Sequence, residues 1–293
     1  MKTNVLWQEM IKDEFEAAVV DRPVCYFSYG LIEPHGVQNA IGLDELKTYA
    51  LVQRVAETSG GVVAPPSWWH VHETPFGLDW LSNQNAPHPY LTSIPPDVFL
   101  HHMVYQLRAA EAAGFRCAIC VTGHYGGIEV DMKQICSIYS ERRPLRAVAL
   151  ADWEAIQYKD FRGDHAGRCE TSQLWALRPE LVDISRIPEE PFAGIRFASS
   201  HDARHSSRQD GEEIVTSQVT FIRHLSDELL RQAKDQPPSE RISWDEAEQI
   251  WQEMLDDRAY WISCHQVEGF SEYLEERRKL FPLPVEGRSD GPI

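Results

Sequence analysis

An apolar run that ends in a glycine-rich turn places the strongest constraint on the fold of this chain. Residues Cys117–Thr122 are strand-like, Gly-His-Tyr-Gly-Gly follows at 123–127, and helical apolar spacing continues from Ile128 to Glu141. A strand that passes through a glycine turn into a helix is a unit of α/β proteins, which expose ligand-binding side chains at such turns. The sequence therefore predicts an α/β fold with His124 at a functional turn.

Strand and helix patterns alternate on both sides of this unit. Further strand signals lie at Val24–Leu31, Gly61–Ala64 and Ala147–Leu150. Helical apolar spacing follows the first strand from Leu43, and a second helix is started by the Pro-Pro-Asp segment at 95–97 and stopped by Gly114. We expect a three-layer α/β/α fold with a mostly parallel central sheet and helices on both faces.

The C-terminal part continues as helix without a recognisable linker. Helical apolar spacing covers 214–234, 244–261 and 270–278, so we expect one domain over 1–293 with a helical part at 214–280. The segment Ser199–Glu213 is polar and lacks an apolar period. It is predicted to be a loop, either a lid over a site or a contact between subunits.

Three short clusters supply carboxylate and imidazole groups of the kind that bind metals. Glu33 and His35 stand two residues apart, so they would leave the end of the first strand on the same side. Asp44 follows, and His124 lies in the glycine turn. The segment His-Ala-Gly-Arg-Cys-Glu-Thr-Ser at 165–172 adds Glu170 and a further histidine. Such a set is typical of a two-metal hydrolase site.

The order and residue patterns of these clusters resemble those of the creatininase (creatinine amidohydrolase) family. That family carries an E-x-H-G segment, a following Asp, a G-H-G-G or G-H-Y-E segment, and an H-A-G-x-x-E-T-S segment. The resemblance runs from Pro23 to Ser172 and includes the Gly-Phe-Arg segment at 114–116 before the central strand. The family resemblance implies a creatininase-like fold.

The resemblance also implies a binuclear site with one bridging aspartate. Glu33, Asp44 and His124 would hold one ion, and His35, Asp44 and Glu170 the other. A carboxylate and imidazole site accepts Zn, Mn or Fe, so two divalent ions of these kinds are the expected cofactors. Two ions roughly 3.5–4 Å apart can polarise a carbonyl and supply a nucleophile near neutral pH.

The histidine of the H-A-G segment is His165, and the resemblance implies that it is the catalytic general acid or base. An imidazole that titrates near neutrality suits the transfer of a proton to a leaving nitrogen. The alternative is a structural role in the loop before the helix of Glu170.

One departure from the family pattern bears on the substrate. Members that hydrolyse creatinine carry Glu two positions after the central histidine, whereas this chain has Gly126. Glu170 must then supply the carboxylate, and creatinine is disfavoured as the substrate.

Aromatic residues and histidines near the clusters are the candidate pocket. An aromatic pair can stack on a planar amide and exclude water. For the tryptophans, a core or interface position is the alternative. His70 and His72 share one face of an extended segment and could bind an extra metal. The candidate substrate-binding residues are Trp68, Trp69, His72, Tyr125 and Trp153.

These features favour a metal-dependent amidohydrolase that opens a carbon–nitrogen bond in a small cyclic amide, formamide or related amide. One alternative is a creatininase-like peptidase that cleaves a modified peptide. The H-A-G-R-x-E-T-S pattern of the peptide-maturation members is closer to residues 165–172 than that of the creatinine type. A catalytically silent metal-binding or scaffold protein is the alternative from another class. The presence of all five ligand residues and His165 counts against it.

Composition limits the partners and the location. The formal charge of −17 argues against nucleic acid or an anionic membrane as a partner. The N-terminus lacks a signal-type apolar core, and no run approaches the ~20 apolar residues of a membrane span, so a cytoplasmic protein is expected. Six irregularly spaced cysteines indicate reduced thiols. The resemblance implies a homo-oligomer, as a hexameric ring, with a dimer as the alternative.

Overall fold

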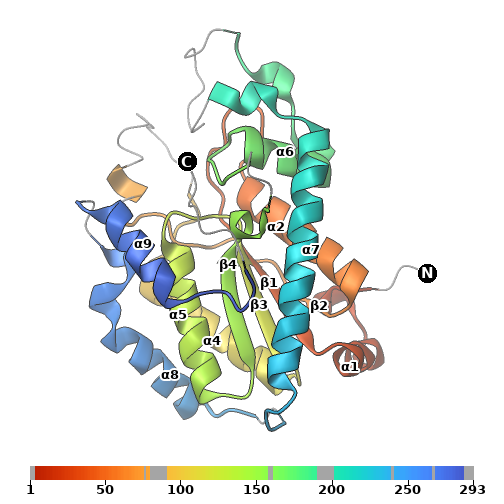
Figure 1. The fold of residues 1–293 in the computed structure, drawn as a ribbon, viewed down its shortest axis with the longest axis vertical. Helices are drawn as coiled ribbons and strands as arrows, with labels where there is room; N and C mark the ends of the chain where they lie inside the picture. The colour runs from red at the N-terminus through yellow and green to blue at the C-terminus, as the bar shows by residue number, and fades with distance from the viewer. Residues whose placement is uncertain are drawn as a thin grey trace.

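The central layer of the molecule is a four-stranded parallel sheet. The computed structural model describes residues 4–75, 77–79, 91–157, 161–189, 201–238, 241–265 and 268–286. In the described chain the strands lie in the order β2-β1-β3-β4, and each neighbouring pair is parallel (Figure 1). The expected parallel sheet is confirmed. The strands are β1 (Val24–Tyr29), β2 (Val62–Val63), β3 (Cys117–Thr122) and β4 (Arg146–Ala151).

Helices cover both faces of this sheet, as predicted. Alternate strand side chains enter two separate cores, because neighbouring residues on a strand point to opposite faces. Cys25 and Phe27 join the core under α4 (Pro96–Ala112), α5 (Ile128–Arg142) and α8 (Trp244–Asp256). Val24 and Tyr26 join the core under α2 (Leu43–Ser59) and α7 (Arg208–Ala233). Other α-helices with described bounds are α1 (Lys12–Asp21), α6 (Arg168–Leu177) and α9 (Phe270–Leu280).

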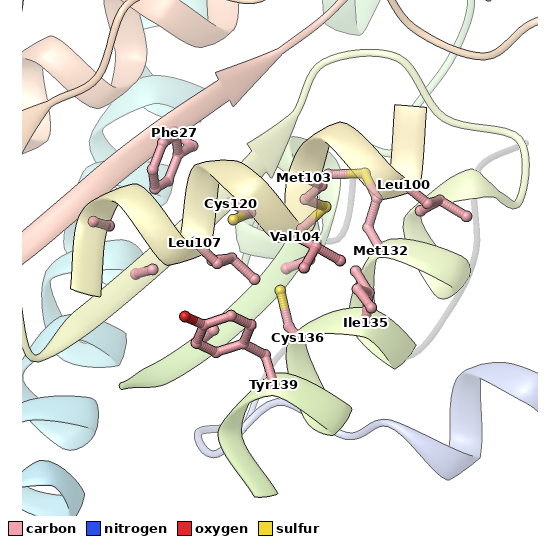
Figure 2. Packing of buried hydrophobic residues seen from close by; sticks show 14 of the residues in the cluster. Phe27, Leu100, Met103, Val104, Leu107, Cys120, Met132, Ile135, Cys136 and Tyr139 are labelled. Carbon is pink, nitrogen blue, oxygen red and sulfur yellow. The ribbon is translucent and has the colours of Figure 1, made fainter. Parts of the chain in front are cut away.

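Figure 2 shows how one of these cores is filled. Leu100, Met103, Val104 and Leu107 come from α4 and face residues of α5. Their spacing of three and four residues forms one apolar stripe on the helix, which is the pattern that predicted it. The α5 residues of this core are Met132, Ile135, Cys136 and Tyr139.

Among the described helices, none is long and apolar enough to span a bilayer.

The carboxyl ends of three strands meet in register at one edge of the sheet. Tyr29 at the end of β1 pairs with Thr122 of β3, and Thr122 pairs with Ala151 of β4. The chain leaves β1 toward β2 on one side, whereas β3 and β4 lie on the other side. Such a switch point is where open α/β sheets place their ligands. The residues after Tyr29, Thr122 and Ala151 are therefore brought together by the topology.

The first strand is shorter than predicted. Val24–Leu31 was the predicted extent, but β1 ends at Tyr29 and Gly30 donates its backbone N–H to the carbonyl of Ser67, outside the ladder. Glu33 and His35 therefore lie on a loop. The prediction that they leave the end of the first strand on the same side was wrong, because the strand ends before them. Their positions depend on loop contacts, such as the hydrogen bond from the Glu33 backbone N–H to the Ile41 carbonyl at 2.9 Å.

The prediction of a loop over Ser199–Glu213 was also wrong. Residues 199 and 200 lie outside the described residues, a 3-10 helix covers His201–His205, and α7 begins at Arg208. The Ser207 side chain caps α7 by accepting the backbone N–H of Asp210 at 3.0 Å. Gly211 is buried so closely against the carbonyl of Ser172 that an added Cβ would overlap with it. In the first turn of α7 the buried residue is this glycine, so no apolar period marks the start of the helix.

Two further boundaries differ from the sequence prediction. The helix expected over 244–261 ends at Asp256 and gives way to short 3-10 turns at Arg258–Tyr260 and Ile262–Cys264. The helix α1 was not predicted, because it is amphipathic only weakly and buries none of its residues. The six cysteines are all free thiols, as expected.

Two glycines allow the start of α2 to pack directly against the ends of β1 and β3. A Cβ added at Gly30 would overlap with the backbone of Glu45, and one added at Gly123 would overlap with the carbonyl of Asp44 and the hydroxyl of Thr48. No larger residue fits without moving the helix. The position of Asp44 in the first turn of α2 is set by this contact.

The Gly123→Ala variant is expected to lose about 1–3 kcal/mol of unfolding free energy, because the added methyl group overpacks this contact. Urea denaturation measures the loss. Combining Gly123→Ala with Thr48→Ala should recover only part of it, since the carbonyl of Asp44 still blocks the methyl group. Thr48→Ala alone is the matched control. Wild-type stability of Gly123→Ala would contradict this account of the packing.

Candidate metal centre

The structure brings all five predicted ligand residues and His165 to one place at the edge of the sheet. Asp44 and Glu170 each lie in the first turn of a helix, α2 and α6. The other groups come from loops after β1 and β3 and before α6. Glu33, His35, Asp44 and Glu170 expose no more than 2% of their surface. Residues from four separate segments thus form one buried cluster.

Asp44 lies between the two histidines of the cluster. Its Oδ1 is 3.0 Å from Nε2 of His35, and its Oδ2 is 3.3 Å from Nδ1 of His124. Each carboxylate oxygen therefore faces a different imidazole. Burial, which raises the pKa of Asp44, is outweighed by His35 and His124, and the net pKa is lowered. This is the arrangement that a bridging carboxylate requires.

The backbone fixes the orientation of His35. Its Nδ1 lies 3.0 Å from the carbonyl oxygen of Glu33, which can only accept, so Nδ1 carries a proton and Nε2 is the nitrogen that faces the cluster. Nε2 faces Asp44, with Glu33 Oε1 and Glu170 Oε2 each 3.8 Å away. A backbone carbonyl that holds the outer nitrogen is the usual support of a metal-binding histidine.

Two buried atoms fit a bound cation. In the described chain, His35 Nε2 and Asp44 Oδ2 find no hydrogen bond of acceptable geometry. Burial would lower the pKa of His35, but Asp44, Glu33 and Glu170 outweigh it and raise the pKa to about 9. The negative charge of the cluster thus draws a proton onto His35, in the position where a metal ion would bind.

Glu33 contacts two histidines, one on each oxygen. Its Oε1 lies 2.9 Å from Nδ1 of His124, and its Oε2 lies 3.1 Å from Nε2 of His72. Burial, which raises its pKa, is outweighed by His124 and His165, so the pKa of Glu33 is well below its usual value. The potential ligand atoms form three groups within 4.8 Å: Glu33, His72 and His124; Glu33, His35 and His165; His35, Asp44 and Glu170.

Glu170 is held in place by polar groups on its outer side. Lys47 Nζ lies 2.7 Å from its Oε1, and the hydroxyl of Tyr125 lies 2.9 Å from the same oxygen. The backbone N–H of Ala166 donates to Oε2 at 2.8 Å. Lys47 also pairs with Asp152 at 3.0 Å. With Oε1 engaged by Lys47, Glu170 presents Oε2 toward His35.

Sequence reasoning did not identify Lys47 and Asp152. Lys47 is three residues after Asp44 on α2, so both side chains lie on one helix face. Asp152 directly follows β4, in register with the other strand ends. Burial would lower the pKa of Lys47, but Asp152 and Glu170 raise it, and the ammonium stays charged. Both signals were present in the sequence, but neither belongs to a recognised motif.

His165 lies against His35 with its unprotonated nitrogen toward the cluster. The ring centroids are 4.5 Å apart. Its Nε2 is 3.0 Å from the carbonyl of Pro34, which only accepts, so in the neutral ring Nε2 carries the proton. Nδ1 then faces Glu33, 3.9 Å from Oε1. Burial lowers the pKa of His165, so the ring is neutral near pH 7 and Nδ1 can accept a proton.

The candidate substrate-binding residues lie in different places. Tyr125 contacts Glu170, and His72 contacts Glu33. Trp153 is buried in a core cluster, with 1% of its surface exposed. Trp68 and Trp69 line a mainly apolar cavity of about 710 Å³ that also includes Phe27 of β1.

His70 has a structural position. Its Nδ1 accepts the backbone N–H of Val71 at 2.8 Å, so the protonated Nε2 donates to the hydroxyl of Thr122 at 3.1 Å. The hydroxyl of Thr122 in turn donates to the carbonyl of His124. Burial lowers the pKa of His70 to about 3, so the ring stays neutral. His70 therefore supports the turn of His124, and both of its nitrogens are engaged.

We expect Lys47→Met to destabilise the protein by about 3–5 kcal/mol, because Glu170 and Asp152 would be left buried without their shared cation. Urea denaturation measures this. Adding Asp152→Asn to Lys47→Met removes one of the stranded charges and should restore part of the stability. If the double variant is no more stable than Lys47→Met, the charge argument is wrong.

The sequence and the fold of this chain are similar to those of known amidohydrolases. Residues 8–223 match the family model described as Creatininase: Creatinine amidohydrolase. A creatinine amidohydrolase of Pseudomonas putida is 26% identical over 213 residues, which cover 66% of this chain and 79% of the relative.

Two solved creatininase structures have the same fold. A manganese creatininase aligns with a TM-score of 0.59 at 23% identity, covering 80% of this chain and all of the other. A creatininase variant of the Zn–Zn type aligns with a TM-score of 0.55 at 23% identity, covering 80% and 99%. The match to the family model extends over most of the chain. The chain belongs to the creatininase family of amidohydrolases, which act on carbon–nitrogen bonds other than peptide bonds.

Proposed function

We propose that this protein is a binuclear metal-dependent amidohydrolase. The observation that carries the proposal is the placement of Asp44, whose two oxygens face His35 and His124 separately. Glu33, Asp44 and His124 would hold one divalent ion, and His35, Asp44 and Glu170 the other. The solved relatives described as manganese and Zn–Zn forms support Mn or Zn, and the ligand types also admit Fe.

The ions and His165 have separate tasks in this proposal. When bound, a pair of divalent ions supplies Lewis acidity that polarises an amide carbonyl and makes water nucleophilic near neutral pH. As the water oxygen attacks the carbonyl carbon, Nδ1 of His165 accepts the proton of the water. The same nitrogen then donates this proton to the leaving nitrogen as the carbon–nitrogen bond breaks. The carbonyl of Pro34 keeps the other ring nitrogen protonated throughout.

The substrate we propose is a small cyclic amide, a formamide or a related amide other than creatinine. Gly126 has a φ of 132°, a backbone conformation that a glutamate there would adopt only with strain. With glycine at position 126 the turn offers no carboxylate there, and in the proposed site Glu170 of α6 would contribute one. A site altered at this residue is expected to prefer a different amide.

The cytoplasmic location and homo-oligomeric assembly stay predictions from the sequence.

The proposal is tested by metal analysis of protein purified without chelators, followed by a substrate screen. The screen contains lactams, cyclic imides, N-formyl compounds and creatinine, with short peptides as the competing class. We expect two divalent ions per chain and turnover of at least one amide or lactam. A protein that binds no divalent ion, or that cleaves only the peptides, would overturn the proposal.

Removal of the bridging carboxylate should affect both ions. Asp44→Ala is expected to lose both metals, whereas Glu33→Ala should mainly weaken one, because the ligands of the other remain. Elemental analysis of the two purified variants, with circular dichroism as a folding control, measures this. A fully metallated and active Asp44→Ala protein would exclude the two-metal site.

Removal of His165 should separate chemistry from metal binding. His165→Ala is expected to retain near wild-type metal content and to lose a factor of ~10²–10⁴ in turnover, which is the usual contribution of a positioned acid or base. The control is His101→Ala, because His101 lies on α4 and contacts Glu248 instead of the cluster. Loss of metal would show that His165 is a ligand, and unchanged turnover would make its role structural.

A further inference from the structure

We propose that His72 is a ligand of the ion held by Glu33 and His124, and that it makes the two metal positions unequal. This inference rests on the proposed binuclear site and extends it. The first position would have four protein ligands, namely Glu33, His72, His124 and Asp44. The second would have three, namely His35, Asp44 and Glu170.

The position of His72 supports a direct role. The residue is 6% exposed, and its Nε2 lies 3.1 Å from Oε2 of Glu33. Its ring centroid is 5.3 Å from that of His124, whose Nδ1 lies 2.9 Å from the other oxygen of Glu33. The two imidazoles thus contact different oxygens of the Glu33 carboxylate. Potential ligand atoms of the three residues lie within 4.8 Å of one another, so the group could hold one ion.

The contrast with His70 shows that His72 is not simply a packing histidine of the same segment. Both nitrogens of His70 are committed to Val71 and Thr122, and the ring holds the turn of His124. His72 instead directs Nε2 at a carboxylate of the cluster. The two-residue spacing of the pair allows one histidine to support the turn and the other to reach the site.

The different numbers of protein ligands give the two ions different roles in the proposed site. Four protein ligands are typical of closed, structural zinc positions, whereas three leave room for water or substrate. Lys47 engages Oε1 of Glu170, so this residue offers one oxygen to the second position and does not close it. The first ion is therefore expected to be the tightly held one. The second is expected to exchange readily.

His165 lies between the two positions and in contact with the open one. Its ring is tilted by 31° against that of His35, a proposed ligand of the second ion, with centroids 4.5 Å apart, and its Nδ1 lies 3.9 Å from Oε1 of Glu33 in the first position. The group proposed to transfer the proton is thus next to the position with fewer protein ligands. Chemistry is assigned to the second ion, and the first ion, with His72, maintains the geometry of Glu33 and Asp44.

The test compares His72→Phe with wild type and with His101→Ala. Phenylalanine keeps a ring of similar size but has no nitrogen, and His101 is a histidine outside the cluster. Each protein is loaded with Zn²⁺, dialysed against a weak chelator and analysed for metal. Titration with Co²⁺ follows the visible absorption, which is strong for four-coordinate and weak for six-coordinate cobalt. Circular dichroism verifies folding.

We expect wild type and His101→Ala to retain one of two zinc ions after dialysis. His72→Phe should lose that ion, with affinity reduced about 100-fold or more, because even a supporting residue contributes 10–100-fold. Its strong Co²⁺ band should also disappear. Two ions bound by His72→Phe with unchanged affinity and spectrum would overturn the role of His72 and leave the binuclear proposal intact. Wild type without zinc before dialysis would instead refute the binuclear proposal itself.

Discussion

The contact between the start of α2 and the ends of β1 and β3 is the constraint on which the site depends. Gly30 and Gly123 provide the space, and the helix backbone fills it. As a result, Asp44 enters between groups that follow two different strands. The parallel register sets the strand ends level with each other, so a helix that touches both can place one carboxylate between them. A sheet with staggered strand ends would separate His35 from His124.

The second constraint is electrostatic, because the cluster buries several carboxylates at high cost unless cations accompany them. Lys47 offsets Glu170 and Asp152, and the histidines offset Glu33 and Asp44. Burial still raises the pKa of Asp152 to about 6. The buried negative charge exceeds what Lys47 alone can balance, so the cluster favours further positive charge. Protonation of His35 and His124, whose pKa values are raised by the neighbouring carboxylates, provides this in the free protein, and divalent ions would provide it more strongly.

The sequence was sufficient for the central strands, because these depend on local patterns, whereas the proposed ligands follow from the family resemblance and stay predictions. The run at 117–122 predicted β3 with its observed bounds, and the polar residues after each strand predicted the place of the cluster. The start of α7 could not be predicted, since its buried residue is Gly211 and close packing of a glycine leaves no apolar signal. Lys47 was not assigned to the centre, and His72 was predicted as a pocket residue or a ligand of an extra metal, for a related reason. Their roles arise from contacts with Glu170 and Glu33, which lie far away in the chain.

In the proposed site a carboxylate comes from Glu170 and none comes from position 126 in the turn after β3, which determines the parts of the fold that would support the chemistry. Glu170 lies at the start of α6, whose first turn is held by Asp164 through the backbone N–H groups of Cys169 and Glu170. Helix α6 in turn packs against α7, where Gly211 touches the carbonyl of Ser172. A ligand on the turn after β3 would depend on the sheet alone. If the carboxylate comes from α6 as proposed, the second metal position would depend also on the packing of α6 on α7, and a substitution at Gly211 is expected to act on the site from a distance.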